Sequence, residues 1–327
     1  MNSLIGYTQF AQDVPDNRGK INIIIFNVLY QYYDTILRNK PDRRQTSLYH
    51  VLQQCIIVPK SSDIMDHKHL HYSNLIGIPT PYFASPAFNL SPVAVHINGV
   101  REMNGPLFQT LNRMDRAEAP PLFMEHMRVM FELDAEPEPG EKPRFRAHYL
   151  RLLRGWFFDA NRPEGAVLKG WAESRFGLIP LFHREPLPDI NCPAYWAYVA
   201  EKMSPRFHNN AIFSQLDLLY EYAQYFLHRF GPKTGRLTLY RGANLLSGEH
   251  QVLEKREKTV WVVRNNSLVS YTSEKERADE FGDVILRVGV PFEKVLCFPD
   301  LLPGKLSASE AEYILLGGDY LSEVVEF

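Results

Sequence analysis

RLTLYRGA at residues 236–243 begins a run of short apolar segments that decides the fold of this chain. Each segment is rich in β-branched or aromatic residues, and turn residues separate it from the next, which predicts β-strands. One short helix is expected among them, at Glu274–Phe281. The other predicted strands are KTVWVVR (258–264), SLVSYTS (267–273), VILRVGV (284–290), KVLCFP (294–299), EYILLGG (312–318) and YLSEVVEF (320–327).

The chain before Gly231 shows mostly helical patterns. Residues 65–110 are an exception, because they contain many Pro, Gly, Ser and Asn residues and so predict ordered loop. The charged segment DAEPEPGEKPR (134–144) is expected to form an exposed linker. Apolar residues at helical spacing predict helices at residues 21–37, 120–133, 145–160 and 193–230.

Composition excludes several classes of protein. The chain has 327 residues, of which 45% are hydrophobic, so it can bury a sizeable core. A net charge of -2 without basic blocks argues against nucleic acid or an anionic membrane surface as a partner. No apolar run is long enough to span a membrane, and the first residues lack a signal-peptide pattern. Three scattered cysteines predict neither a disulfide framework nor a zinc site, so we expect a cytoplasmic protein.

Three segments of the β-rich part carry residues suited to chemistry. LTLYRG (237–242) is a strand that ends in Arg and Gly. LVSYTS (268–273) is a strand with alternating hydroxyls, and SEAEYIL (309–315) is a Glu-x-Glu that leads into an apolar strand. Each pattern alone occurs by chance in many proteins. In this order they resemble the Arg…Ser-x-Ser…Glu-x-Glu signature of arginine-directed ADP-ribosyltransferases.

The resemblance implies a role for an arginine and two hydroxyls in binding NAD. A guanidinium such as that of Arg241 grips a pyrophosphate through two parallel hydrogen bonds, and Gly242 lets the backbone come close. Ser270 is expected to orient the nicotinamide ribose and the catalytic glutamate. The second hydroxyl of the signature is replaced, because the chain reads Ser-Tyr-Thr at 270–272; which of Ser270, Thr272 and Ser273 acts stays open. We also assign Tyr240, Thr272 and Phe281 to NAD binding.

The resemblance gives the two glutamates separate tasks. Cleavage of the nicotinamide–ribose bond passes through an oxocarbenium-like state, which a carboxylate on the ribose 2′-hydroxyl stabilises. The resemblance assigns this task to Glu312. A protonated arginine is a poor nucleophile, so a second carboxylate, Glu310, is expected to orient it and take its proton. In extended chain, the i, i+2 spacing places both carboxylates on one side.

Four other segments are similar to a narrower family, the dinitrogenase reductase ADP-ribosyltransferases. This resemblance implies transfer of ADP-ribose from NAD to one arginine of the nitrogenase iron protein, which switches nitrogen fixation off. It also implies a PII-type regulatory protein as a partner, and no metal. The segments are HYSNLIGIP (71–79), FASPAFN (83–89), INGVREMN (97–104) and GWAESRFG (170–177).

We therefore expect an α+β protein with a helical N-terminal part and a C-terminal split β-sandwich of the ADP-ribosyltransferase type. Residues 1–64 are expected to be an N-terminal helical extension. Residues 65–230 are expected to form a mostly helical and loop region packed on the catalytic part, and residues 231–327 the β-rich NAD-binding core.

Three alternatives stay open: the same transfer to another protein acceptor, a non-catalytic NAD- or ADP-ribose-binding regulator, and an NAD glycohydrolase that uses water. Two smaller features favour structure over function. Arg101 and Asn104 are interpreted as buried structural groups more readily than as NAD or acceptor ligands. The alternating His67, His69 and His71 would share one face of a strand, but no second cluster of ligands accompanies them.

Overall fold

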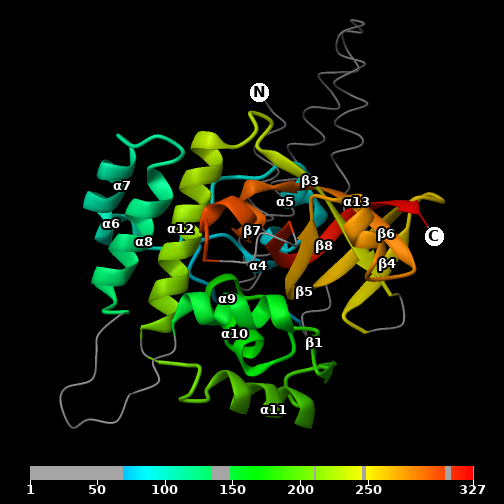
Figure 1. Ribbon diagram of the computed structural model, residues 1–327. Helices are drawn as coiled ribbons and strands as arrows, with labels where there is room; N and C mark the ends of the chain where they lie inside the picture. The colour runs from blue at the N-terminus through cyan, green and yellow to red at the C-terminus, as the bar shows by residue number, and fades with distance from the viewer. Residues whose placement is uncertain (1–68, 134–147, 210, 245–247, 306–310, 327) are drawn as a thin grey trace, which may run out of the picture. The chain divides into compact units, whose positions relative to one another are not determined.

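The computed structural model describes residues 69–133, 148–209, 211–244, 248–305 and 311–326 (Figure 1). The helix expected at residues 21–37, the linker at 134–144 and the candidate residue Glu310 lie outside these ranges. None of the helices in these ranges has both the length and the hydrophobicity that a membrane span needs.

The helical part precedes the sheet in the chain, as the sequence predicts. Its longest helix, α12, spans 19 residues and buries most of them. In Figure 1, α12 stands between the group α6–α8 and the sheet, while α9, α10 and α11 lie together beside the sheet. The helices are α4 (Thr80–Phe83), α5 (Pro86–Leu90), α6 (Val100–Met103), α7 (Gly105–Leu111), α8 (Ala119–Met130), α9 (Tyr149–Phe158), α10 (Pro163–Phe176), α11 (Pro193–Lys202) and α12 (Ile212–Phe230).

Five helices of this part were not predicted individually. Residues 80–111 hold four short helices where ordered loop was expected, and proline occupies the first turn of three of them, α4, α5 and α7. Helix α10 was not predicted, because it has no polar face: its buried residues include even Lys169 and Glu173. A two-stranded ribbon, β1 (Phe182–His183) with β2 (Glu185–Pro186), follows α10.

The sheet closes on itself in a small barrel-like ring. Its strand order is β4-β5-β3-β6-β8-β7, and β5 also pairs with β8, so β5, β3, β6 and β8 form the ring. Helix α13 (Lys275–Asp279) follows β5, where a short helix was expected. The strands are β3 (Arg236–Ala243), β4 (His250–Lys255), β5 (Val260–Thr272), β6 (Val284–Pro291), β7 (Val295–Cys297) and β8 (Glu312–Glu326).

The strands β5 and β8 are each one long strand where two short strands were expected. Their antiparallel register runs from Val260 opposite Glu323 to Thr272 opposite Glu312, with an irregularity between Asn265 and Leu268. Gly317 lies at this irregularity, and a Cβ there would lie 1.7 Å from the carbonyl oxygen of Asn266. The polar and glycine residues that suggested turns therefore form a bulge that bends both strands without ending them.

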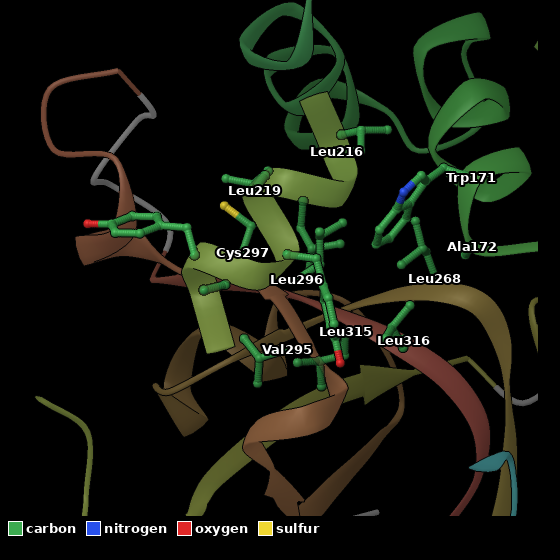
Figure 2. Packing of buried hydrophobic residues seen from close by; sticks show 14 of the residues in the cluster. Trp171, Ala172, Leu216, Leu219, Leu268, Val295, Leu296, Cys297, Leu315 and Leu316 are labelled. Carbon is green, nitrogen blue, oxygen red and sulfur yellow. The ribbon is translucent and has the colours of Figure 1, made fainter. Parts of the chain in front are cut away.

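The helices and the sheet share one hydrophobic core. Figure 2 shows Leu216 and Leu219 of α12 over Val295, Leu296 and Cys297 of the β7 segment. On the other side of the view, Trp171 and Ala172 of α10 pack toward Leu268 of β5 and Leu316 of β8. Residues 69–230 and the sheet are therefore packed together through this shared core wherever the structure describes them, and two smaller clusters lie within the sheet and within the helical part.

Candidate active site

Arg241 lies near the end of β3, opposite Leu286 of β6. Its Nη1 donates a hydrogen bond to the carbonyl oxygen of Ser270 at 2.9 Å, and its Nη2 lies 3.2 Å from a carboxylate oxygen of Glu249. Its Nε is buried and has no hydrogen-bond partner among the described residues. The guanidinium therefore ties the end of β3 to β5 and keeps one donor unused.

Ser270 lies on the face of β5 that points toward the helices. Its hydroxyl oxygen accepts a hydrogen bond from the indole Nε1 of Trp156, in α9, at 2.9 Å. Side chains two residues apart on a strand share a face, so Leu268, Ser270 and Thr272 point the same way. Because Leu268 packs with α10, this face is the one covered by helices (Figure 2).

Glu312 begins β8 and lies directly opposite Thr272 in the ladder, so the two side chains are on one face. Ser270 lies one diagonal step from Glu312 on that same face. The hydroxyl of Thr272 accepts from the backbone N–H of Glu274 at 3.1 Å, at the start of α13. Of the hydroxyls left open by the sequence, Thr272 thus supports a turn, while Ser270 faces the helical layer.

The glutamate pair is only half within the described structure, since Glu310 lies outside it. Ala311 has a φ of 43°, in the left-handed region. The expected i, i+2 alignment assumed extended chain through this residue. That assumption was wrong, because the strand begins only at Glu312. The role of Glu310 stays a prediction from the resemblance.

Three further residues were expected to bind NAD. At Gly242, a Cβ would lie 2.0 Å from the carbonyl oxygen of Ala278 in α13, so packing of that helix already requires glycine here. Tyr240 pairs with Thr272, the one register pair between β3 and β5. Phe281 follows α13 and is 69% exposed. An exposed aromatic ring beside the end of β3 is available to stack on a ligand; all three assignments stay predictions.

Four site neighbours were missed by sequence reasoning, because no motif in the sequence marks them. Trp156 reaches Ser270 from α9, and Glu249 reaches Arg241 from the residue before β4. Asn161, in the turn between α9 and α10, lies 3.5 Å from the other carboxylate oxygen of Glu249. His250 is buried, and both of its ring nitrogens lack a partner among the described residues.

Burial and the charges of this cluster change the pKa values of His250 and Lys169. Burial, and then the positive charge of Arg241, lower the pKa of His250 to about 4, against the opposing effect of Glu249. His250 is therefore neutral at pH 7. Burial lowers the pKa of Lys169 in α10 to about 7, although Glu249 raises it. Lys169 donates to the side-chain oxygen of Asn161 at 3.0 Å.

The other residues singled out in the sequence lie in structural contacts. Arg101 forms an ion pair at 3.0 Å with the fully buried Glu221 and lies over the ring of Phe108. Asn104 donates to the carbonyl oxygen of Val100 at 2.8 Å. His71 contacts Glu173 at 3.1 Å. In the described residues, no group of three or more His, Cys, Asp and Glu side chains is placed to hold a metal ion.

An arginine, a serine and a glutamate lie on three joined strands, in the chain order that the resemblance to ADP-ribosyltransferases predicts. The sequence profile of the dinitrogenase reductase ADP-ribosyltransferase family matches residues 73–324. The chain is also 48% identical over 264 residues to the NAD(+)–dinitrogen-reductase ADP-D-ribosyltransferase of Rhodospirillum rubrum, covering 77% of this chain and 94% of that one. No solved structure matches the chain. The chain therefore belongs to the dinitrogenase reductase ADP-ribosyltransferase family, and the resemblance predicted from its sequence is confirmed.

Proposed function

We propose that this chain moves ADP-ribose from NAD to an arginine of dinitrogenase reductase, the nitrogenase iron protein, and so inactivates it. The observation that carries the proposal is the match to the family along nearly all of the described structure. The relative in Rhodospirillum rubrum is named for the same donor and the same acceptor. The candidate residues Arg241, Ser270 and Glu312 lie on the adjoining strands β3, β5 and β8, and the Arg241 guanidinium donates to the backbone carbonyl of Ser270, which supports the chemistry.

The strand pairing supports the split β-sandwich of the ADP-ribosyltransferases. The strands β3 and β5 meet at a single register pair, whereas β3 pairs with β6 along its whole length. The ring is therefore weakest where Arg241 and Ser270 lie. We propose that the two halves of the sheet separate along this line and that NAD binds against it.

The residues divide the reaction between them. Arg241 holds the pyrophosphate, and its unused Nε donor, buried without an acceptor among the described residues, fits an anionic ligand. Phe281 offers a ring for stacking. Glu312 binds the ribose 2′-hydroxyl and stabilises positive charge as the bond to nicotinamide breaks.

The acceptor arginine then completes the transfer. One guanidinium nitrogen forms a bond to the ribose carbon that nicotinamide leaves, and the bonding electron pair departs with nicotinamide. The proton released by the guanidinium goes to Glu310, in the role that the resemblance gives it. Regulation by a PII-type protein and a cytoplasmic location stay predictions of the same proposal.

The test is transfer of labelled ADP-ribose from NAD to purified dinitrogenase reductase. The wild type is expected to label one arginine, and Glu312→Gln to lose roughly 100-fold or more of the rate, because the amide keeps the shape and removes the charge. Glu323→Gln is the matched control, since Glu323 lies on the same strand in an exposed pair with Arg287.

Each other result has a definite meaning. Nicotinamide release with water alone would replace the transferase by a glycohydrolase. Labelling of other proteins but not of dinitrogenase reductase would overturn the acceptor and keep the chemistry. A wild type that binds NAD without cleaving it would leave a binding regulator.

A further inference from the structure

We propose that Trp156 is a positioning residue of the active site, which limits the directions in which the Ser270 hydroxyl can donate its proton. This inference rests on the proposed function, because Ser270 matters only if the site cleaves NAD. It adds a residue of the helical part that belongs to none of the three strand motifs. Trp156 is 3% exposed, and its indole nitrogen lies 2.9 Å from the Ser270 hydroxyl oxygen.

The chemistry of the two groups sets the polarity of this bond. An indole N–H can only donate, whereas a serine hydroxyl has one proton to donate and two lone pairs that accept. The bond from Trp156 fills one lone pair of Ser270, so the hydroxyl proton must point elsewhere. On the same face of the sheet, Glu312 lies one diagonal step away, roughly 7–8 Å between Cα atoms in a regular ladder.

A hydroxyl held in this way can donate to a carboxylate, or to a ribose oxygen, on the face of the sheet that carries Ser270 and Glu312. A freely rotating serine hydroxyl would spend part of its time donating to other acceptors. With one acceptor position occupied by Trp156, the Ser270 hydroxyl has fewer orientations before the ligand arrives, which lowers the reorganisation needed in the transition state. Replacement of the indole by a phenyl ring keeps an aromatic side chain in the core, removes this donor and leaves a small cavity.

A second contact joins helices α9 and α10, through the turn between them, to the Arg241–Glu249 pair. Lys169 of α10 donates to Asn161 at 3.0 Å, and the amide of Asn161 lies 3.5 Å from Glu249. Glu249 in turn pairs with Arg241. The segment from α9 to α10 therefore reaches both Ser270 and Arg241 through different side chains. A segment that served only to cover the core would not need a polar contact to Ser270 and another to Glu249, the partner of Arg241.

The experiment compares nicotinamide release by the wild type, Trp156→Phe, Ser270→Ala and the double variant. We expect Trp156→Phe to lower kcat roughly tenfold, the loss of one positioned hydrogen bond, with the KM for NAD within about twofold. Because Trp156 acts through Ser270, the double variant is expected to match Ser270→Ala. A purely structural role predicts instead that the two effects multiply.

Trp171→Phe is the matched control. Trp171 is also buried, and its indole donates to Asp217 of α12 at 2.7 Å instead of to a residue of the strand motifs. It is expected to lower stability without a separate effect on kcat. As a readout independent of activity, the indole N–H resonance of Trp156 should shift in Ser270→Ala.

The outcomes separate the two claims. If the wild type cleaves NAD and Trp156→Phe has an unchanged kcat, or if the two variants' effects multiply, this inference alone is overturned. An indole resonance that does not move in Ser270→Ala overturns it as well. A wild type that cleaves no NAD overturns the proposed function, and this inference with it.

Discussion

Two arginine–carboxylate pairs on the same sheet differ in ways that separate structure from function. Arg264 and Asp319 are register partners on β5 and β8, and their bidentate bonds of 2.7 and 3.0 Å leave both side chains buried. Arg241 and Glu249 meet through one bond of 3.2 Å, the carboxylate side chain is 37% exposed, and the Arg241 Nε has no partner among the described residues. In the first pair the guanidinium binds both carboxylate oxygens and is buried. In the second pair the guanidinium can exchange the carboxylate of Glu249 for another anion.

The difference shows what each arginine is suited to do. A saturated, buried pair stabilises a fixed geometry and loses much when one partner is removed. A pair with an exposed carboxylate and an unused donor contributes little to stability and can bind a ligand phosphate. The Arg264–Asp319 pair therefore stabilises the sheet, which we call the frame, and the Arg241–Glu249 pair belongs to the candidate site.

The largest expected effect is on the frame. Asp319→Ala should lower the free energy of unfolding by about 3–5 kcal/mol, because it leaves the buried guanidinium of Arg264 without its partner. Urea denaturation followed by circular dichroism measures this, with Glu249→Ala as the control on the other pair. A loss under about 1 kcal/mol for Asp319→Ala would contradict the contrast between the two pairs.

The second prediction concerns the loss of stability at low pH. It tests the Arg241–Glu249 pair because His250 lies next to it. The pKa of His250 is about 4 in the folded state, from burial and then Arg241, and about 6.5 when unfolded. A lowered folded pKa means that the stabilisation is complete above pH 6.5 and is lost as pH falls toward 4. The difference between these two pKa values corresponds to roughly 3 kcal/mol of stability.

His250→Gln should therefore flatten the loss of stability between pH 6.5 and 4, measured as the urea midpoint at several pH values. The flattening is expected to be partial, since burial and then Lys169 lower the pKa of His183 to about 4 as well. His183→Gln is the matched variant outside the site pair. An unchanged slope in His250→Gln would contradict the burial of a neutral His250 beside Arg241.

The fold could be predicted where local pattern decides it. The strand RLTLYRGA and helix α12 have clear periods of two and about 3.6 residues, and both were found where expected. Helix α10 was missed because burial on every side removes the amphipathic signal. The strands β5 and β8 were divided in two, because a bulge and a turn use the same residues, such as Asn266 and Gly317.

The site could be predicted only as far as its strand motifs. Arg241 stood out from Arg264 because of its place in the motif, since both follow apolar strand residues. Trp156 and Glu249 come from segments whose sequence carries no signal of the contact, and only the packing of α9 against β5 brings the indole to Ser270. Nonlocal contacts of this kind depend on the tertiary fold, which a local pattern does not encode.

The third prediction tests the site pair directly. Arg241→Lys should lower kcat/KM for NAD roughly 100-fold, because an ammonium cannot bind a pyrophosphate with the two-pronged geometry of a guanidinium. The urea midpoint is expected to change little, since the positive charge beside Glu249 is kept. Arg264→Lys is the paired control and should show the reverse, with lost stability and similar kcat/KM in the folded fraction. Equal losses of stability in the two variants would remove the distinction.

The smallest effect is expected at the carboxylate of the site pair. Glu249 competes with a ligand phosphate for the Arg241 guanidinium, so Glu249→Gln should lower the KM for NAD by about two- to fivefold, the range of a partly exposed ion pair. The value of kcat should stay near that of the wild type, because Glu249 does not act on the reacting bond. Added salt should shrink the difference between the two proteins, since it screens the repulsion between Glu249 and the phosphates. If the KM rises instead, Glu249 holds Arg241 in its binding position, and the carboxylate then belongs to the frame of the site and does not compete with the ligand.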